Sequence, residues 1–83
     1  MPKLFFDFDD GRTRFTDADG FELADVEAAR TEVLRTLGEI AKDGLPRGDN
    51  QSFRAHVQDA NGNSVYSASV SVAGTWHGSK PVG

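Results

Sequence analysis

Cysteine is absent from the 83 residues, and no apolar run approaches the length of a membrane-spanning helix. The lack of cysteine excludes a disulfide scaffold, a thiolate zinc site and a cysteine nucleophile. A helical membrane span needs roughly 20 consecutive apolar residues. The N-terminal apolar stretch is short and acidic residues follow it at once, which does not match a signal peptide. These absences predict a small cytoplasmic protein with no membrane partner.

Basic residues are few: 9 against 13 acidic residues, for a net charge of -4. The acidic excess lies within residues 1–32. A clustered basic stripe, which is the usual electrostatic footprint of a nucleic-acid binder, is missing. Nucleic acid is therefore not an expected partner, and the acidic excess is expected to favour solubility.

Residues 3–16 have the pattern of a β-hairpin. Large apolar side chains recur at every second position and predict a strand with one buried face: Leu4, Phe6 and Phe8. Asp9-Asp10-Gly11 is a turn sequence. Residues 12–16 then predict the return strand, in which Thr13 and Phe15 are expected to join the same core face.

The clearest helix of the sequence covers residues 25–43. Its apolar side chains recur three or four residues apart and predict one stripe that faces the core: Val26, Ala29, Val33, Leu37, Ile40 and Ala41, with Leu34 at the edge. Asp25 is a good N-cap because its carboxylate can accept N–H groups of the first turn. Gly44 is expected to take the left-handed conformation after the last turn, and Pro46 to prevent continuation.

Residues 53–58 and 65–72 alternate in the same way and flank an Asn61-Gly62 turn, which predicts a second hairpin. The element order is ββαββ, so one helix must cover one face of a four-stranded antiparallel sheet in an α+β two-layer sandwich. The strand order 2-1-3-4 places the most apolar strand in the centre and keeps all neighbours antiparallel. We expect residues 1–73 to form this single domain and residues 74–83 to form a flexible tail.

Short motifs occur in an order that is similar to a known family. They are Pro2-x-Leu4-Phe5-Phe6-Asp7, then Asp19-Gly20-Phe21-Glu22-Leu23-x-Asp25, and Val57-x-Asp59-x-x-Gly62. The pattern resembles a family of short bacterial proteins catalogued only as a domain of unknown function, over about residues 2–72. The resemblance supports the fold and implies no activity.

The acidic turns are the candidate cation sites. The best candidates are the carboxylates of Asp9, Asp10, Asp17 and Asp19, if their loops lie near one end of the sheet. None of the acidic loops has the full calcium-loop spacing. Because Asp before Gly is ordinary turn chemistry, we predict no bound metal and no other cofactor.

Catalytic motifs are equally scarce. His56 could face Ser67 or Ser69 across the second hairpin, but no nucleophile elbow or other helper motif accompanies it. The sequence also contains no glycine-rich phosphate-binding loop. We therefore predict that the protein is not an enzyme.

The sheet face that the helix leaves open is the expected interaction surface. It should display Phe5, Arg14, Arg54, His56 and Val65. Our leading hypothesis is a small non-enzymatic interaction module that forms a homodimer, either across this face or along a free edge strand.

Two alternatives stay open from the sequence. One is a metal-assisted or small-ligand enzyme assembled between subunits from the acidic loops and His56. The other is a weak single-stranded nucleic-acid binder that uses Phe5, Arg14, Arg54 and Tyr66, since aromatic and arginine side chains on a sheet can stack on bases.

Overall fold

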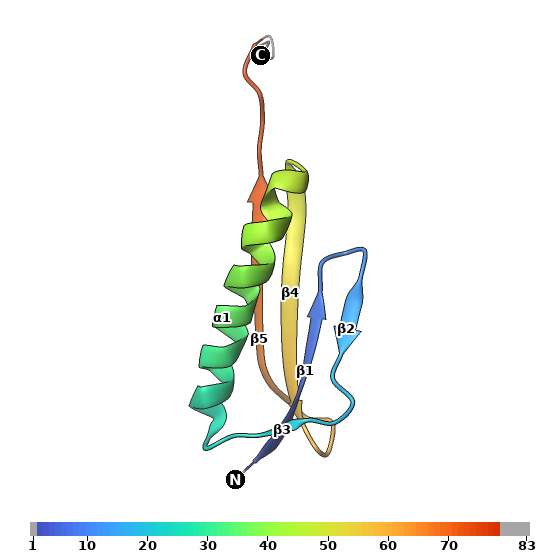
Figure 1. Ribbon diagram of the computed structural model, residues 1–83, viewed down its shortest axis with the longest axis vertical. Coiled ribbons are helices and arrows are strands. Elements are labelled where there is room, and N and C mark those ends of the chain that lie inside the picture. Colours follow the sequence, from blue (N-terminus) through green and yellow to red (C-terminus); the bar gives the residue numbers. More distant parts are fainter. Residues whose placement is uncertain (1, 79–83) are drawn as a thin grey trace.

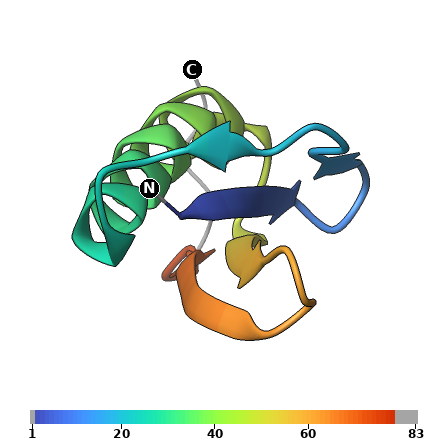
Figure 2. The same cartoon turned by 90° about the horizontal axis from the view of Figure 1, so that it is seen from below.

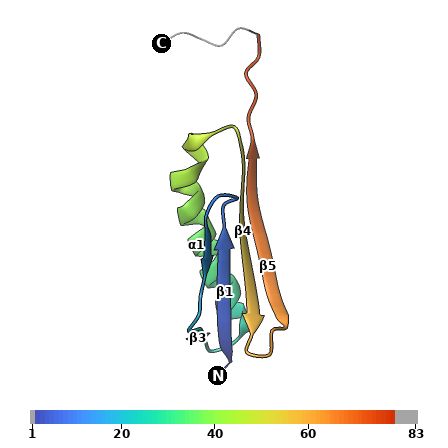
Figure 3. The same ribbon diagram turned by 90° about the vertical axis from the view of Figure 1, so that its right-hand side faces the viewer.

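A computed structural model describes residues 2–78 of the chain. In chain order the elements are β1 (Lys3–Asp9), β2 (Arg14–Thr16), β3 (Phe21–Glu22), α1 (Val26–Gly44), the short 3-10 helix η1 (Leu45–Arg47), β4 (Asn50–Asp59) and β5 (Ser64–Ala73). The helix lies on one side of an antiparallel sheet (Figure 1, Figure 3), so the predicted α+β class is confirmed. Of the expected tail, residues 74–78 follow β5 without helix or strand, and residues 79–83 lie outside the described part.

The four longer strands run in the order β2-β1-β4-β5, which matches the predicted order 2-1-3-4. A fifth strand, β3, was not predicted. It lies beside the start of β1 (Figure 2), and in this pairing Leu4 is opposite Phe21. Because β4 occupies the other side of β1, β2 and β3 share one edge of β1 and are separated by residues 17–20.

The core is formed by alternate positions of β1 and β4 and by one stripe of α1. Its buried members are Leu4, Phe6, Ala29, Val33, Leu37, Ala41, Phe53, Ala55 and Val57. Val26 was expected in this stripe, but its side chain is 52% exposed. It lies in the first turn of α1, on the flank of the helix beside the buried stripe rather than within it. The remaining stripe still packs α1 firmly on the sheet.

The helix covers only part of the sheet. It packs on β4 and β5 and leaves β2 and β3 uncovered (Figure 1). A helix is about 10 Å wide, whereas strands are spaced about 4.8 Å apart, so one helix covers about two strands. The prediction that Phe15 joins the core is therefore wrong: its side chain is 57% exposed. Thr13, in the turn before β2, is also exposed.

The two ends of α1 are stabilised differently. At the start, Asp25 is the N-cap as predicted, and its Oδ1 accepts from the N–H of Ala28 at 2.9 Å. At the end, Gly44 is not left-handed as expected but has φ -92°, and the chain continues directly into η1. The amide Nε2 of Gln51 caps this end by donating to the carbonyls of Gly44 and Leu45 at 2.7 and 2.9 Å. This side chain replaces the predicted glycine cap.

Candidate functional site

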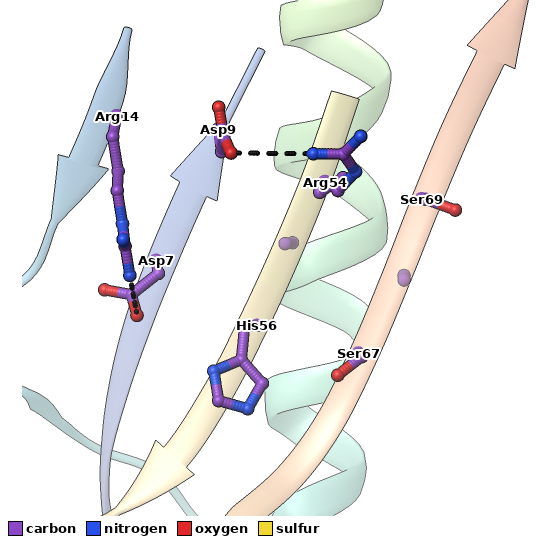
Figure 4. Close-up of a pocket in the computed structure, with 9 residues that line it drawn as sticks. Asp7, Asp9, Arg14, Arg54, His56, Ser67 and Ser69 are labelled. Atoms are coloured by element: carbon purple, nitrogen blue, oxygen red, sulfur yellow. Dashed lines mark ion pairs between the residues drawn. The ribbon is translucent and has the colours of Figure 1, made fainter. Parts of the chain in front are cut away.

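The open face of the sheet carries a shallow depression of about 610 Å³. It is lined by Asp7, Asp9, Arg14, Arg54, Ala55, His56, Ser67, Ala68 and Ser69. Figure 4 shows that the charged side chains come from β1, β2 and β4 and point to the side opposite α1. Three residues of the predicted interaction face therefore lie together here, because β1 is positioned between β2 and β4.

Both arginines of the depression are paired with carboxylates of β1. Arg14 Nη2 lies 3.7 Å from Asp7 Oδ2, and Arg54 Nη1 lies 3.7 Å from Asp9 Oδ2 (Figure 4). Exposed ion pairs of this kind contribute only about 0–1 kcal/mol to stability. Their main effect is that the carboxylates offset the positive charge of the arginines. The depression therefore offers a phosphate backbone little attraction.

His56 makes a hydrogen bond that the sequence did not indicate. Its Nε2 lies 2.8 Å from Ser64 Oγ, whereas the sequence had suggested only Ser67 or Ser69 as possible neighbours. The reason is a β-bulge in the second hairpin, where Val57 pairs with Tyr66 and Gln58 pairs with Ser64. The extra residue shifts the register and brings Ser64 beside the imidazole.

Phe5 and Val65 do not line the depression. Phe5 is half-buried because residues 17–20 pass over it: a Cβ on Gly20 would come within 2.9 Å of Phe5 Cε2. Gly20 also has φ +77°, a conformation that favours glycine. Val65 is half-buried as well and packs against the core at the bulge. The open face therefore offers less apolar surface than the sequence suggested.

Tyr66, the further aromatic of the nucleic-acid alternative, does not share a face with the arginines. It pairs with the buried Val57 and packs against the core on the helix side. The four residues of that alternative are thus divided between the two faces of the sheet.

The acidic side chains considered for a cation act in turns. Asp9 Oδ1 accepts from Gly11 N, Asp10 Oδ1 accepts from the N–H groups of residues 12 and 13, and Asp17 Oδ1 accepts from Asp19 N and Gly20 N. The two loops lie at opposite ends of β2. Within residues 2–78, no three or more His, Asp or Glu side chains are arranged to hold a metal ion.

These turn hydrogen bonds lower the pKa of one candidate carboxylate. The N–H groups of Thr13 and Arg12 hold the pKa of Asp10 below its ordinary value of 3.8. Asp59, in the second hairpin turn, has a lowered pKa for the same reason, with Asn63 as its main donor. Both carboxylates are exposed and serve the turns in which they lie.

A second cavity lies on the helix side of the sheet and was missed by the sequence analysis. This apolar groove of about 430 Å³ runs between α1 and the strands that the helix leaves uncovered. It is lined by Phe6, Phe8, Phe15, Asp17, Phe21, Leu23, Glu32 and Thr36. Phe21 is 58% exposed, and its ring meets Phe6 edge-on with 5.8 Å between centroids.

The third notable surface is the free edge of β5. Among the described residues this ten-residue strand pairs with β4 alone, and it contains no charged residue and no proline. Gly74 N donates to Asp49 O at 2.7 Å, so the backbone of residue 74 points toward β4. Because directions alternate along an antiparallel strand, the backbone N–H and C=O groups of Ser67, Ser69 and Ser71 point away from β4 to the open edge.

A family model named as domain of unknown function DUF6894 matches residues 3–71. The chain belongs to this family. The match confirms the resemblance inferred from the motifs, and it assigns no activity. Neither a curated protein nor a solved structure matches the chain.

The matched part of this DUF6894 chain contains the depression, the groove and most of β5. All three surfaces thus belong to the family domain rather than to the residues that follow it. Within the described residues, no helix is both long and apolar enough to cross a membrane.

Proposed function

We propose that this domain is a non-enzymatic interaction module that forms a homodimer by pairing its β5 edge with β5 of a second copy. The ten-residue free edge of β5 carries the proposal. Natural proteins usually protect exposed edges with charge, proline, bulges or very short strands. Residues 67–73 of this edge lack these protections, and antiparallel pairing about a two-fold axis would satisfy the outward backbone groups of Ser67, Ser69 and Ser71.

The position of the helix fits the same dimer. The helix packs on both β4 and β5. A helix axis above the gap between these strands would lie about 5 Å from a two-fold axis placed beside β5, given the strand spacing of about 4.8 Å. Two such helices would lie about 10 Å apart, close to the distance at which helices pack. Pairing of the edges therefore brings the two helices into contact without a change in either copy.

The flank of α1 that would meet its mate carries exposed apolar side chains. Glu32 and Thr36 line the groove on one flank. Positions 26, 30, 34 and 38 therefore lie on the opposite flank, toward β5, by helical spacing. Val26 is 52% exposed and Leu34 is 41% exposed. A second copy would remove both from water, at about 25 cal/mol per Å² of apolar area.

The other hypotheses have less support. In the depression the arginines are paired with Asp7 and Asp9, which disfavours a nucleic-acid role. The carboxylates of the acidic loops already accept backbone N–H groups, which disfavours a metal-assisted enzyme. A dimer across the open face has less apolar area to bury, because Phe5 is covered by Gly20.

Sedimentation velocity over a series of concentrations tests the proposal. The wild-type protein should sediment at twice the chain mass of 9.0 kDa. Ser69→Pro should be a monomer, because it removes an N–H from the open edge without removing a bond of the β4–β5 ladder. Ser69→Ala is the matched control and should remain a dimer. A wild-type mass of 9.0 kDa at every concentration would contradict the proposal.

A second pair of variants separates the two possible dimers. Leu34→Glu should weaken a dimer formed at the β5 edge, since a charge would be placed in the contact between helices. Phe5→Ser should leave that dimer intact. Dissociation by Phe5→Ser but not by Leu34→Glu would instead place the contact on the open face.

A further inference from the structure

The apolar groove brings several phenylalanine side chains together on the helix side of the sheet. Phe15 and Phe21 form its outer wall, and both are more than half exposed. Phe6 and Phe8 form the floor, and α1 forms the opposite wall. Exposed apolar surface that is contiguous and hollowed is typical of a binding groove rather than of ordinary protein surface.

One carboxylate that lines the groove has an oxygen without a partner. Asp17 Oδ1 accepts from the N–H groups of Asp19 and Gly20 at 3.1 and 3.0 Å, but Oδ2 is buried and has no hydrogen-bond donor. A buried carboxylate oxygen without a donor is unfavourable. Glu32 adds a second negative charge at the helix wall, although its Oε1 is paired with Arg35 at 2.7 Å. The charge of the groove thus complements a cation.

The spacing of the groove residues matches an extended chain. Phe15 lies opposite Phe8, Asp17 N donates to Phe6 O, and Phe21 lies opposite Leu4. These three groove residues therefore follow one another at steps of two residues along β1. Side chains on one face of a strand also recur every two residues, about 7 Å apart.

We propose that the groove binds an extended peptide segment of another protein, in which an Arg or Lys lies two residues from a large apolar side chain on either side. The peptide lies extended in the groove, between α1 and the helix-side face of β2 and β3. Its two apolar side chains contact Phe15 and Phe21, and its basic group pairs with the carboxylate of Asp17. The pattern apolar-x-basic-x-apolar is thus the chemistry that this groove recognises.

This proposal is independent of the β5 dimer. The groove and β5 lie toward opposite edges of the sheet. The groove is on one flank of α1, and the flank that faces β5 is on the other. The Ser69→Pro variant should therefore bind the same peptide with unchanged affinity. Failure of the dimer leaves the groove as described, and failure of the groove leaves the dimer as described.

Titration of the ¹⁵N-labelled protein with a defined probe tests the proposal. The probe is the blocked pentapeptide Leu-Ser-Arg-Ser-Leu, added up to millimolar concentration. Its binding is monitored through the amide chemical shifts of the protein. The amides of Phe15, Asp17 and Phe21 should shift, while those of Ser67 and Ser69 should not. Two control peptides, with Glu in place of Arg or Ser in place of both Leu, should bind at least fivefold more weakly.

Matched variants identify the carboxylate. Asp17→Asn retains an oxygen for the N–H groups of Asp19 and Gly20 but removes the charge. It should reduce the affinity for the arginine peptide at least fivefold. Asp19→Asn removes the same charge from an exposed position of the same loop and should change affinity less than twofold. If Asp17→Asn does not fold, Phe21→Ser provides the second test, since Phe21 is 58% exposed.

Several results would overturn the proposal. They are equal affinity for the Arg and Glu peptides, equal effects of Asp17→Asn and Asp19→Asn, shifts confined to β5, or no shift with any of the three peptides. Shifts confined to the groove that appear on raising protein concentration without peptide would show that a second copy occupies it, and would also overturn the proposal.

Discussion

The ring of Phe53 packs directly on Gly44, where a Cβ would come within 2.6 Å of Phe53 Cε1. Phe53 is 2% exposed and belongs to the core, so its ring has little room to move. This contact explains why a glycine with ordinary helical torsions ends α1. The residue is needed for its small size rather than for left-handed geometry.

Gly44→Ala should therefore destabilise the fold by about 1–3 kcal/mol, because the added methyl overpacks the contact with Phe53. Gly38→Ala is the matched control, since a Cβ there would have no neighbour within 4 Å. It should raise stability by about 0.5–1 kcal/mol through helix propensity. Urea denaturation at low protein concentration measures both. A stabilising effect of Gly44→Ala would contradict the packing seen here.

The centre of the helix stripe should be sensitive to truncation. Leu37 is 1% exposed, so Leu37→Ala should cost about 2–5 kcal/mol through lost burial and the cavity left behind. Leu34→Ala, three residues earlier and 41% exposed, should cost less than about 1 kcal/mol in the monomer. Thermal melting of both variants in the Ser69→Pro background compares them without self-association. Equal losses would show that the wrong helix face has been assigned to the core.

The N-cap of α1 should contribute modestly. Asp25→Ala removes the acceptor for Ala28 N and should cost about 0.5–2 kcal/mol. Asp25→Ser keeps a capping oxygen and should restore most of this stability. Melting midpoints with and without a chelator provide the check. A midpoint that falls on chelation in wild type but not in Asp25→Ala would instead identify this carboxylate as a cation ligand.

Stability should decline in acid because of two turn aspartates. The pKa values of Asp10 and Asp59 lie below 3.8 in the folded protein, mainly through the N–H groups of Thr13 and Asn63. A lowered folded-state pKa contributes stability that is present above the unfolded value and lost as pH falls through the folded value. The melting midpoint should therefore decrease as the pH falls below 3.8. In the double variant Asp10→Asn, Asp59→Asn this decrease should be smaller, and an identical slope would contradict the assignment.

The strand alternation and the helix stripe were readable from the sequence. Leu4 and Phe6 in β1, and Phe53 and Val57 in β4, are buried as their period of two predicted. Asp25 caps α1 as its position before the apolar stripe predicted. These features depend on hydrogen bonds and side-chain directions within a few residues, so local sequence determines them.

Part of the candidate site was also predictable. Alternation placed Arg14, Arg54 and His56 on the open face, where they line the depression. Their partners were not predictable, because Asp7, Asp9 and Ser64 reach them only through strand order and a bulge. A shift of one residue in register changes such pairs without changing either strand's own pattern.

Only the tertiary structure decided which apolar side chains remain exposed. Phe8 and Phe15 face the same side of the sheet, yet Phe8 packs against the core whereas Phe15 is 57% exposed. The pattern of a strand shows which face is apolar, but not whether a helix lies over that part of it. Coverage depends on where a single stripe on α1 settles across the sheet, and that position is set by contacts between segments distant in sequence. The groove exists because the stripe packs on β4 and β5, and one helix is too narrow to reach β2 as well.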